Sequence, residues 1–283
     1  MIFWGGQPLS MAGWHAGRMQ NSLYPSDLTD EQWELLQVVL PPTKAAGTRG
    51  RPPADRRRLC NGLLYFVRAG CAWRLLPRDF GPWQTVYHYF ALWTRQGCWQ
   101  VVHDVLRDAV RAQAGKRSEP TAAIMDSQTV RAGDQAGERG YDAAKKTKGI
   151  KRHVLVDTLG LLLAVSVTPA DVPERAGARG FLGPALACFR WLRRLWADQG
   201  YDGPDLAAWV AAHRKTGTLR LEVVPRNQDQ KGFAALPKRW IVERTFGWLM
   251  KHRRLVRHYE IKPAHAEAWV QIAMIGLMLR RLA

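Results

Sequence analysis

Cysteine is scarce in this chain of 283 residues, and its placement indicates neither a zinc site nor a disulfide framework. The four cysteines are scattered, with no CxxC pair and no pair of histidines at zinc-ligand spacing. Free thiols in a reducing compartment are therefore expected. The N-terminus also lacks a basic start followed by a long apolar core, so the sequence argues against secretion and favours a cytoplasmic protein.

Long hydrophobic runs are missing as well. No segment reaches the ~18 apolar residues that a membrane-spanning helix needs, and the apolar stretch 268–279 runs directly into Arg280 and Arg281. Membrane is therefore the weakest candidate partner. The hydrophobic fraction of 47% still supports one large core or two ordinary ones, which excludes a disordered chain.

Acidic residues are few compared with basic ones. The chain has 24 Asp and Glu against 42 Lys and Arg, which gives a net charge of +18 and an isoelectric point near 10.4. A charge of this size does not set a fold, but it favours a polyanionic partner such as DNA or RNA.

The first part of the chain divides into a leader and a helical region. Residues 1–22 show neither helical nor strand periodicity, so we expect a disordered leader, with the start at Met1, Met11 or Met19. Residues 23–115 are predicted to form a helical DNA-binding domain, with its main helices over 31–40, 55–68, 82–95 and 99–113.

A basic connector rich in glycine and proline joins the first two helices over residues 43–53. Its composition excludes regular structure. Arg49 and Arg51 therefore either contact a nucleic-acid backbone or lie in a solvated linker, and the sequence leaves both readings open.

A helix that ends at Gly70, a short turn of helix over 73–76 and a longer helix opening at Pro82 outline a helix-turn-helix unit. Pro82 is expected at the first helical position. The alternative is a plain helical bundle whose aromatic residues are all core. In the first reading, the side chains that would face a DNA groove are Gln84, Thr85, His88 and Arg95.

The chain changes character after the linker 115–120, and we predict an α/β domain over 121–283. Strands are expected over 122–130, 153–158, 161–169, 194–198 and 219–225, with a basic loop over 131–151. Helices are expected over 181–192, 204–213 and 239–254. The apolar stretch 269–282 is either core or a dimer contact.

Three acids stand out by position. Asp126 and Asp198 are each expected at the carboxyl end of a buried strand, where an unpaired charge is costly and where sites of α/β sheets collect. Glu243 is the one acid of the basic helix 239–254, one turn after Arg239, and is either an ion-pair partner or a metal ligand. If the three converge, oxygen ligands without His or Cys suit Mg²⁺ or Mn²⁺.

The other acids have simpler interpretations. Asp157 precedes the Leu159-Gly160 turn and is expected to cap it, and Asp202 before Gly203-Pro204 is expected to be a helix N-cap. Asp171 and Glu174 flank Pro173 in a predicted loop. The remaining acids of the basic loop are expected to balance its charge.

Several phrases together resemble the IS5 family of insertion-sequence transposases, namely YPSDLTDEQWELL, LPRDFGPWQTVYHYFALW, MDSQTVR, GERGYDAAKKTKGIKRHVLVDTLGLL, ADQGYDG and RWIVERTFGWLMKHRRLVRHYE. The resemblance runs in order from Tyr24 to the C-terminus. It implies an RNase H-like catalytic core, a mixed sheet flanked by helices, behind an all-α helix-turn-helix-like domain. It also implies that the three acids of a DDE transposase are Asp126, Asp198 and Glu243.

The resemblance includes the Y-R-E-K signature of the wider IS4/IS5 group, but not completely. Arg239 matches its arginine and Glu243 its acid. Leu236 stands where the tyrosine would be, and Met250 stands where the lysine would be, so Lys251 is at most a substitute. The short interval from Asp198 to Glu243 leaves room for one helix and one strand, without a large inserted domain.

The implied activity is that of a DNA transposase. It would bind inverted terminal repeats, cleave at the ends and join the 3′-OH to target DNA with two Mg²⁺ ions, or Mn²⁺ in their place, as a homodimer on double-stranded DNA at the bacterial nucleoid. The rival readings are a catalytically silent repressor and an RNase H-like nuclease. The expected phosphate-contacting residues of the core are Arg239, Lys251, Arg253, Arg254, Lys145, Lys146, Lys148 and Arg152.

Overall fold

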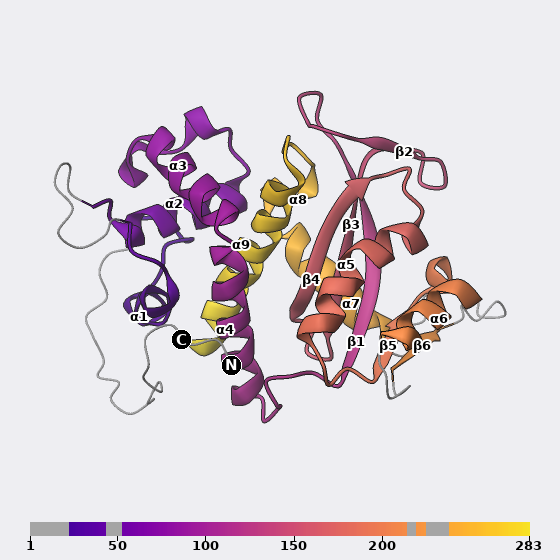
Figure 1. Ribbon diagram of the computed structural model, residues 1–283. Coiled ribbons are helices and arrows are strands. Elements are labelled where there is room, and N and C mark those ends of the chain that lie inside the picture. The colour runs from indigo at the N-terminus through magenta and orange to yellow at the C-terminus, as the bar shows by residue number, and fades with distance from the viewer. Residues whose placement is uncertain (1–22, 44–52, 214–218, 225–237) are drawn as a thin grey trace.

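The computed structural model describes residues 23–43, 53–213, 219–224 and 238–283. Within these residues a group of α-helices precedes a six-stranded mixed sheet with helices on both faces (Figure 1). This is the predicted fold class, an all-α region followed by an α/β core. The leader 1–22 and the connector arginines Arg49 and Arg51 lie outside the described residues.

The helical region follows the sequence prediction closely. Thr29 caps the first helix through a capping box with Gln32, and Asp55 caps the second by accepting from the backbone N–H of Arg57 and Arg58. Gly70, at φ 69°, ends the second helix as expected. The elements are α1 (Asp30–Val39), α2 (Arg56–Ala69), the 3-10 turns η1 (Trp73–Leu75) and η2 (Arg78–Phe80), α3 (Trp83–Arg95) and α4 (Cys98–Gln113).

One prediction in this region is wrong by a position. Pro82 is the N-cap of α3 and not its first helical residue. Its ψ of 127° lies outside the helical range, so the helix begins one residue later, at Trp83.

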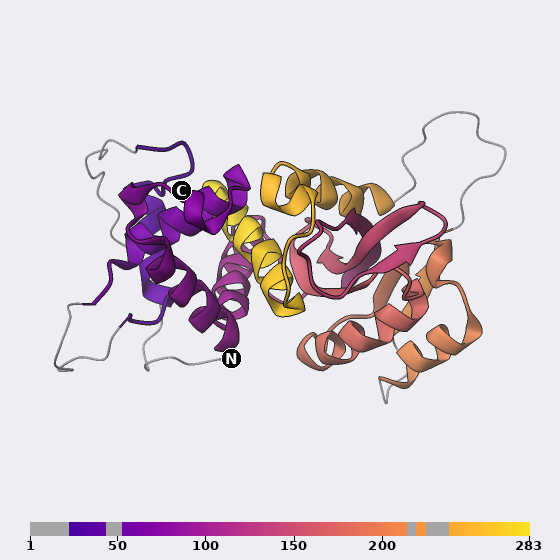
Figure 2. The same ribbon diagram turned by 90° about the horizontal axis from the view of Figure 1, so that it is seen from above.

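The last helix, α9 (Pro263–Leu282), lies between the helical region and the sheet in both views (Figures 1 and 2). Trp269 stacks on Phe66 of α2 and Phe90 of α3, with ring centroids 4.9 and 4.2 Å apart. The side chain of Trp269 is 1% exposed. The apolar C-terminal stretch is therefore core, which settles that alternative against a dimer contact.

One hydrophobic cluster runs from the helical region through α9 into one face of the sheet. It contains Leu63, Phe90 and Trp93 together with Ile124 and Val154 of the sheet. This shared core crosses the boundary between the predicted domains 23–115 and 121–283. The division into two domains stays a prediction.

The sheet has the strand order β2-β3-β1-β5-β6, with β4 also paired to β3. β3 runs antiparallel to β1, β2 and β4, whereas β1, β5 and β6 are mutually parallel. The strands are β1 (Ala122–Arg131), β2 (Gly140–Asp142), β3 (Thr147–Asp157), β4 (Leu162–Pro169), β5 (Arg194–Ala197) and β6 (Arg220–Val223).

The predicted loop 131–151 is wrong in part, because it contains β2 and the first residues of β3. The sequence does not indicate these strands, because the segment is rich in exposed lysines and lacks the alternation of apolar and polar residues that is typical of a strand. Gly149 makes the pairing possible: a Cβ on it would lie 1.9 Å from the carbonyl oxygen of Val130.

Two helix predictions also differ from the structure. α5 (Glu174–Cys188) begins well before residue 181, where several glycines had concealed it. The basic helix 239–254 is two helices, α7 (Arg239–Met250) and α8 (Arg253–Val256), because His252 between them is extended at φ −102° and ψ 111°.

The remaining helices cover the two faces of the sheet. Figure 2 shows α7 and α8 on one side, with α5 and α6 (Pro204–Ala212) on the other. In the described residues between Asp198 and Glu243 the regular elements are the 3-10 turn η3 (Gln199–Tyr201), α6 and β6, in line with a short interval without an inserted domain. No helix in the described ranges is long and apolar enough to cross a membrane.

Candidate active site

The fold brings the three predicted acids to one place. Asp198 directly follows β5, as expected, and caps η3. Asp126 does not end its strand, because antiparallel pairing with β3 continues to Arg131. The parallel pairing of β1 with β5 stops at Ile124, however, so Asp126 projects just beyond the end of β5, beside Asp198.

α7 supplies the third acid and the arginine that joins the group. Arg239 and Glu243 are one helical turn apart, and Arg239 Nη2 lies 3.7 Å from Asp126 Oδ2, 3.7 Å from Asp198 Oδ2 and 3.9 Å from Glu243 Oε1. One guanidinium nitrogen is thus the common neighbour of three carboxylates. The ion pair between Arg239 and Glu243 is present, but it is one of three contacts to Arg239.

The site is an electrostatically strained group of carboxylates. Burial, followed by the charge of Asp198, raises the pKa of Asp126 to about 7. Burial and then the charge of Glu174 raise the pKa of Asp198. The backbone N–H groups of Ser127 and Gly200 donate to Asp126 and Asp198 at 2.7 and 3.0 Å, respectively. These hydrogen bonds lower the two pKa values and so offset only part of the rise.

Glu174 is a residue of this site that the sequence analysis missed. It was expected in a loop beside Pro173, but it is the first residue of α5, and Ser127 Oγ donates to its Oε1 at 2.8 Å. A Cβ on Gly200 would lie 1.8 Å from Glu174 Oε2, so Glu174 rests directly against the turn that carries Asp198. An acid directly after a proline, which could open a helix, was the available signal.

The donor set fits hard divalent cations. Asp126, Asp198 and Glu243 offer carboxylate oxygens without a competing thiolate or imidazole, which suits Mg²⁺ and Mn²⁺. In the described part of the chain, no three His, Cys, Asp or Glu side chains are yet arranged as ligands around one point. Arg239 lies among the acids, so it would have to move aside for cations to bind.

Most of the predicted DNA-contacting side chains are accessible. Gln84, His88 and Arg95 are exposed along α3, and Thr85 is half-buried beside them. In the α/β part of the chain, the predicted DNA-contacting residues with exposed side chains are Lys145, Lys146, Lys148, Lys251 and Arg253. Contact with DNA by any of these residues stays a prediction.

Two of the predicted DNA-contacting side chains, those of Arg152 and Arg254, have partners inside the protein, so contact with DNA by them stays a prediction that the structure disfavours. Arg152 is 3% exposed and donates to Gln128 Oε1 and to the carbonyl of Leu255, and burial lowers its pKa to about 10. Arg254 pairs with Glu260 at 2.5 Å, and its guanidinium also lies over the ring of Phe66. A count of basic residues cannot separate such structural arginines from surface ones.

The pairing of Arg254 gives a stability prediction with a matched neighbour. Arg254→Ala leaves Glu260 charged and unpaired in a site where both side chains are 10% exposed, so we expect a loss of about 3 kcal/mol of unfolding free energy. Arg253→Ala removes an exposed charge next to it and is expected to cost under about 1 kcal/mol. Urea unfolding of the two variants measures the difference, and equal midpoints would contradict it.

The two capping acids have opposite outcomes. Asp157 caps the turn as predicted, by accepting from the backbone N–H of Leu159 and Leu161 at 2.9 and 2.8 Å, and it also pairs with Arg111. Asp202 is not the N-cap of α6, which is Gly203 at φ 157° without a side-chain cap. The helix begins at Pro204, as expected, so its N-cap is the residue directly before Pro204.

Comparison with known proteins identifies two family profiles that match this chain. The profile of the family described as "Transposase DDE domain" matches residues 117–279, and that of "Putative transposase of IS4/5 family" matches residues 28–103. No solved structure matches the chain significantly.

Two curated relatives come from Burkholderia cepacia. The "Insertion element IS402 uncharacterized 16.2 kDa protein" is 31% identical over 37% of this chain and 73% of its own length. The "Putative transposase for insertion sequence element IS402" is 30% identical over 40% of this chain and 54% of its own length. The DDE-domain match covers more than half of the 283 residues and contains all three acids. The chain therefore belongs to the family of insertion-sequence transposases that carry a DDE domain.

Proposed function

We propose that this transposase binds the inverted terminal repeats of an insertion sequence, cleaves the DNA at those ends and joins the freed 3′-OH to target DNA. Family membership supports an enzyme that acts on DNA. The observation that carries the finer proposal is the convergence of Asp126, Asp198 and Glu243 on one guanidinium nitrogen.

The three acids are proposed to hold two Mg²⁺ ions, for which Mn²⁺ can substitute. When bound, such ions activate the attacking oxygen and stabilise the leaving oxygen of an in-line phosphodiester displacement. Burial, and after it the repulsion between neighbouring carboxylates, raises the pKa of Asp126 and of Asp198. These shifts support the assignment, because nearby positive charge stabilises the ionised acids.

Arg239 is proposed to exchange partners when DNA arrives. Without DNA, its guanidinium partly neutralises the three carboxylates. A phosphate oxygen that enters beside the acids offers it a charge-assisted hydrogen bond, which leaves the carboxylates free for cations. Arg239 therefore reduces the repulsion among the three carboxylates before DNA binds, and it then positions the DNA strand.

The DNA surface is proposed to have two parts. The exposed side of α3 would read the terminal repeat, since the phosphate contacts of the core supply affinity without sequence information. Both ends have to be joined in one complex, so we propose a homodimer assembled on DNA.

A strand-transfer assay with pre-cut ends tests the proposed chemistry. The substrate is a duplex of the terminal repeat with a free 3′-OH, offered with plasmid target and Mg²⁺. Joined products are expected. Hydrolysis without joining would indicate an RNase H-like nuclease, and repeat-specific binding without either reaction would indicate a silent repressor.

A further inference from the structure

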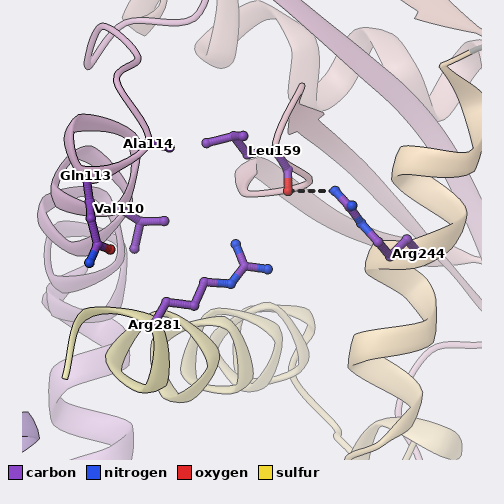
Figure 3. A pocket seen from close by; sticks show the side chains of 6 residues that line it. All are labelled: Val110, Gln113, Ala114, Leu159, Arg244 and Arg281. Atoms are coloured by element: carbon purple, nitrogen blue, oxygen red, sulfur yellow. Dashed lines mark hydrogen bonds between the residues drawn. The ribbon is translucent and has the colours of Figure 1, made fainter.

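A pocket of about 400 Å³ lies where the helical region meets the α/β part, and none of the acids of the site above lines it (Figure 3). Figure 3 shows the guanidinium of Arg281 reaching into the space between α4 and the β3–β4 turn, with Arg244 on the far side. We call this the arginine pocket, and it is lined by Val110, Gln113, Ala114, Leu159, Arg244 and Arg281.

The arginine pocket holds more positive charge than its surroundings neutralise. Within the described residues, neither Arg244 nor Arg281 has a carboxylate oxygen within 4.0 Å. The nearby carboxylate of Asp157 is committed to Arg111. The charge of Asp157 also acts to raise the pKa of Arg244 and of Arg281, against the larger effect of burial, so three guanidinium groups share this one carboxylate.

The hydrogen-bonding capacity of the two lining arginines is also largely unused. Arg244 Nη2 donates to the carbonyl of Leu159 at 2.9 Å, but Arg244 Nε is buried without a partner. For Arg281, the described part of the chain supplies no hydrogen-bond acceptor, and its guanidinium lies over the ring of Trp248 at 4.6 Å.

The two arginines share that ring. The guanidinium of Arg244 also lies over Trp248, at 4.8 Å, so two like charges flank one aromatic side chain. Burial lowers the pKa of both groups, and the charge of Arg244 lowers that of Arg281 further, while the charge of Asp157 offsets only part of these shifts. Two partly buried positive charges so close together are energetically unfavourable unless an anion balances them.

We propose that the arginine pocket binds a phosphate group. Planar guanidinium forks match the oxygens of a phosphate and can bind it in bidentate fashion, and the excess positive charge is what a phosphate neutralises. A bound phosphate would join α4, the β3–β4 turn, α7 and α9, and so would fix the helical region against the core.

The favoured source of this phosphate is the DNA backbone, and this part of the inference rests on the proposed function. Glu243 and Arg244 are consecutive on α7. Asp126 is three residues along β1 from Ala123, which pairs with Asp157 beside the pocket. Three strand residues span about 10 Å, and three steps of B-DNA span about the same length at 3.4 Å each. A duplex cut at the acids would therefore present other phosphates near the pocket.

The experiment compares Arg281→Met with Arg280→Met. Both variants lose one charge from adjacent positions of α9, but only Arg281 lines the pocket. Affinity for a duplex carrying the terminal repeat is measured without divalent ions over a range of salt concentrations. We expect Arg281→Met to weaken binding by about tenfold and to reduce the salt slope by about one, with a much smaller change for Arg280→Met.

A second arm uses pyrophosphate and thermal unfolding to identify the source of the phosphate. If the pocket binds a free anion instead of DNA, pyrophosphate raises the melting temperature of the parent and of Arg280→Met but not that of Arg281→Met. In that case the affinity for DNA changes by the same factor in Arg280→Met and in Arg281→Met. Arg281→Lys keeps the charge without the planar fork and is expected to recover only part of the lost binding.

The inference is overturned if both variants bind DNA alike and pyrophosphate stabilises all proteins equally or none. This outcome is separate from a failure of the proposed function, because binding is measured without metal and strand transfer is scored independently on the parent. A parent that joins pre-cut ends while the two variants bind alike would remove the phosphate site and leave the transposase proposal intact.

Discussion

Asp126→Asn is expected to abolish DNA cleavage while leaving binding to the terminal repeat in place. An amide cannot replace the negative charge of the carboxylate that is most buried in the site, so the cleavage rate should fall by more than about a thousandfold. Cleavage of labelled end DNA with Mg²⁺ and a gel-shift assay of the same DNA measure the two properties.

Two controls make this result specific. Asp134→Asn makes the same chemical change at an exposed acid of the basic segment and should leave cleavage unchanged. Mg²⁺-dependent cleavage by Asp126→Asn at a rate near that of the parent would contradict the assignment of the site.

The same variant should not unfold more easily, which separates lost chemistry from lost structure. The pKa of Asp126 is raised to about 7 from an ordinary 3.8, so the folded state binds its proton more tightly than the unfolded state. Ionisation of Asp126 therefore costs stability, and this cost grows as the pH rises from about 4 to about 7. At pH 8 without metal, Asp126→Asn should melt at or above the temperature of the parent.

Asp157→Ala is expected to have the largest effect on stability. Asp157 is fully buried, holds the β3–β4 turn through two backbone N–H groups and pairs with Arg111, which is 4% exposed. Its removal leaves a buried arginine uncompensated, so the unfolding free energy should fall by about 3–5 kcal/mol. Denaturant unfolding of the metal-free protein measures it.

The surface pair of Arg57 and Asp30, at 2.6 Å with both side chains about a quarter exposed, provides the comparison. Asp30→Asn should cost less than about 1 kcal/mol. In the double variant Arg111→Met with Asp157→Asn both charges are gone, and it should recover part of the loss. If Asp157→Ala costs no more than Asp30→Asn, the buried pair does not stabilise the fold.

The sequence predicted those features that depend on local pattern. The turn cap Asp157 and the glycine Gly70 that ends α2 follow from interactions within a few residues, and the structure has both. Asp126 and Asp198 could be found because each interrupts or follows an apolar run that has to be buried. A strand end was nevertheless the wrong marker for Asp126, since β3 extends its pairing beyond the site.

What the sequence could not predict depends on contacts between distant segments. Glu174 reaches Ser127 across 47 residues, and nothing local to either residue indicates that contact. Arg152 looks like any other basic residue until its partner Leu255, 103 residues further along the chain, is placed in space. Arg244 and Arg281 likewise become a pair only when α7 and α9 pack.

The position of α9 has a consequence for how the protein is made. Trp269 completes the aromatic stack of Phe66 and Phe90, yet it leaves the ribosome after every strand of the sheet has been synthesised. The apolar face of the helices that are translated first therefore stays exposed to solvent until the end of translation. During that time it can aggregate or bind chaperones. A nascent chain interrupted before α9 would thus lack a folded helical region as well as a complete core.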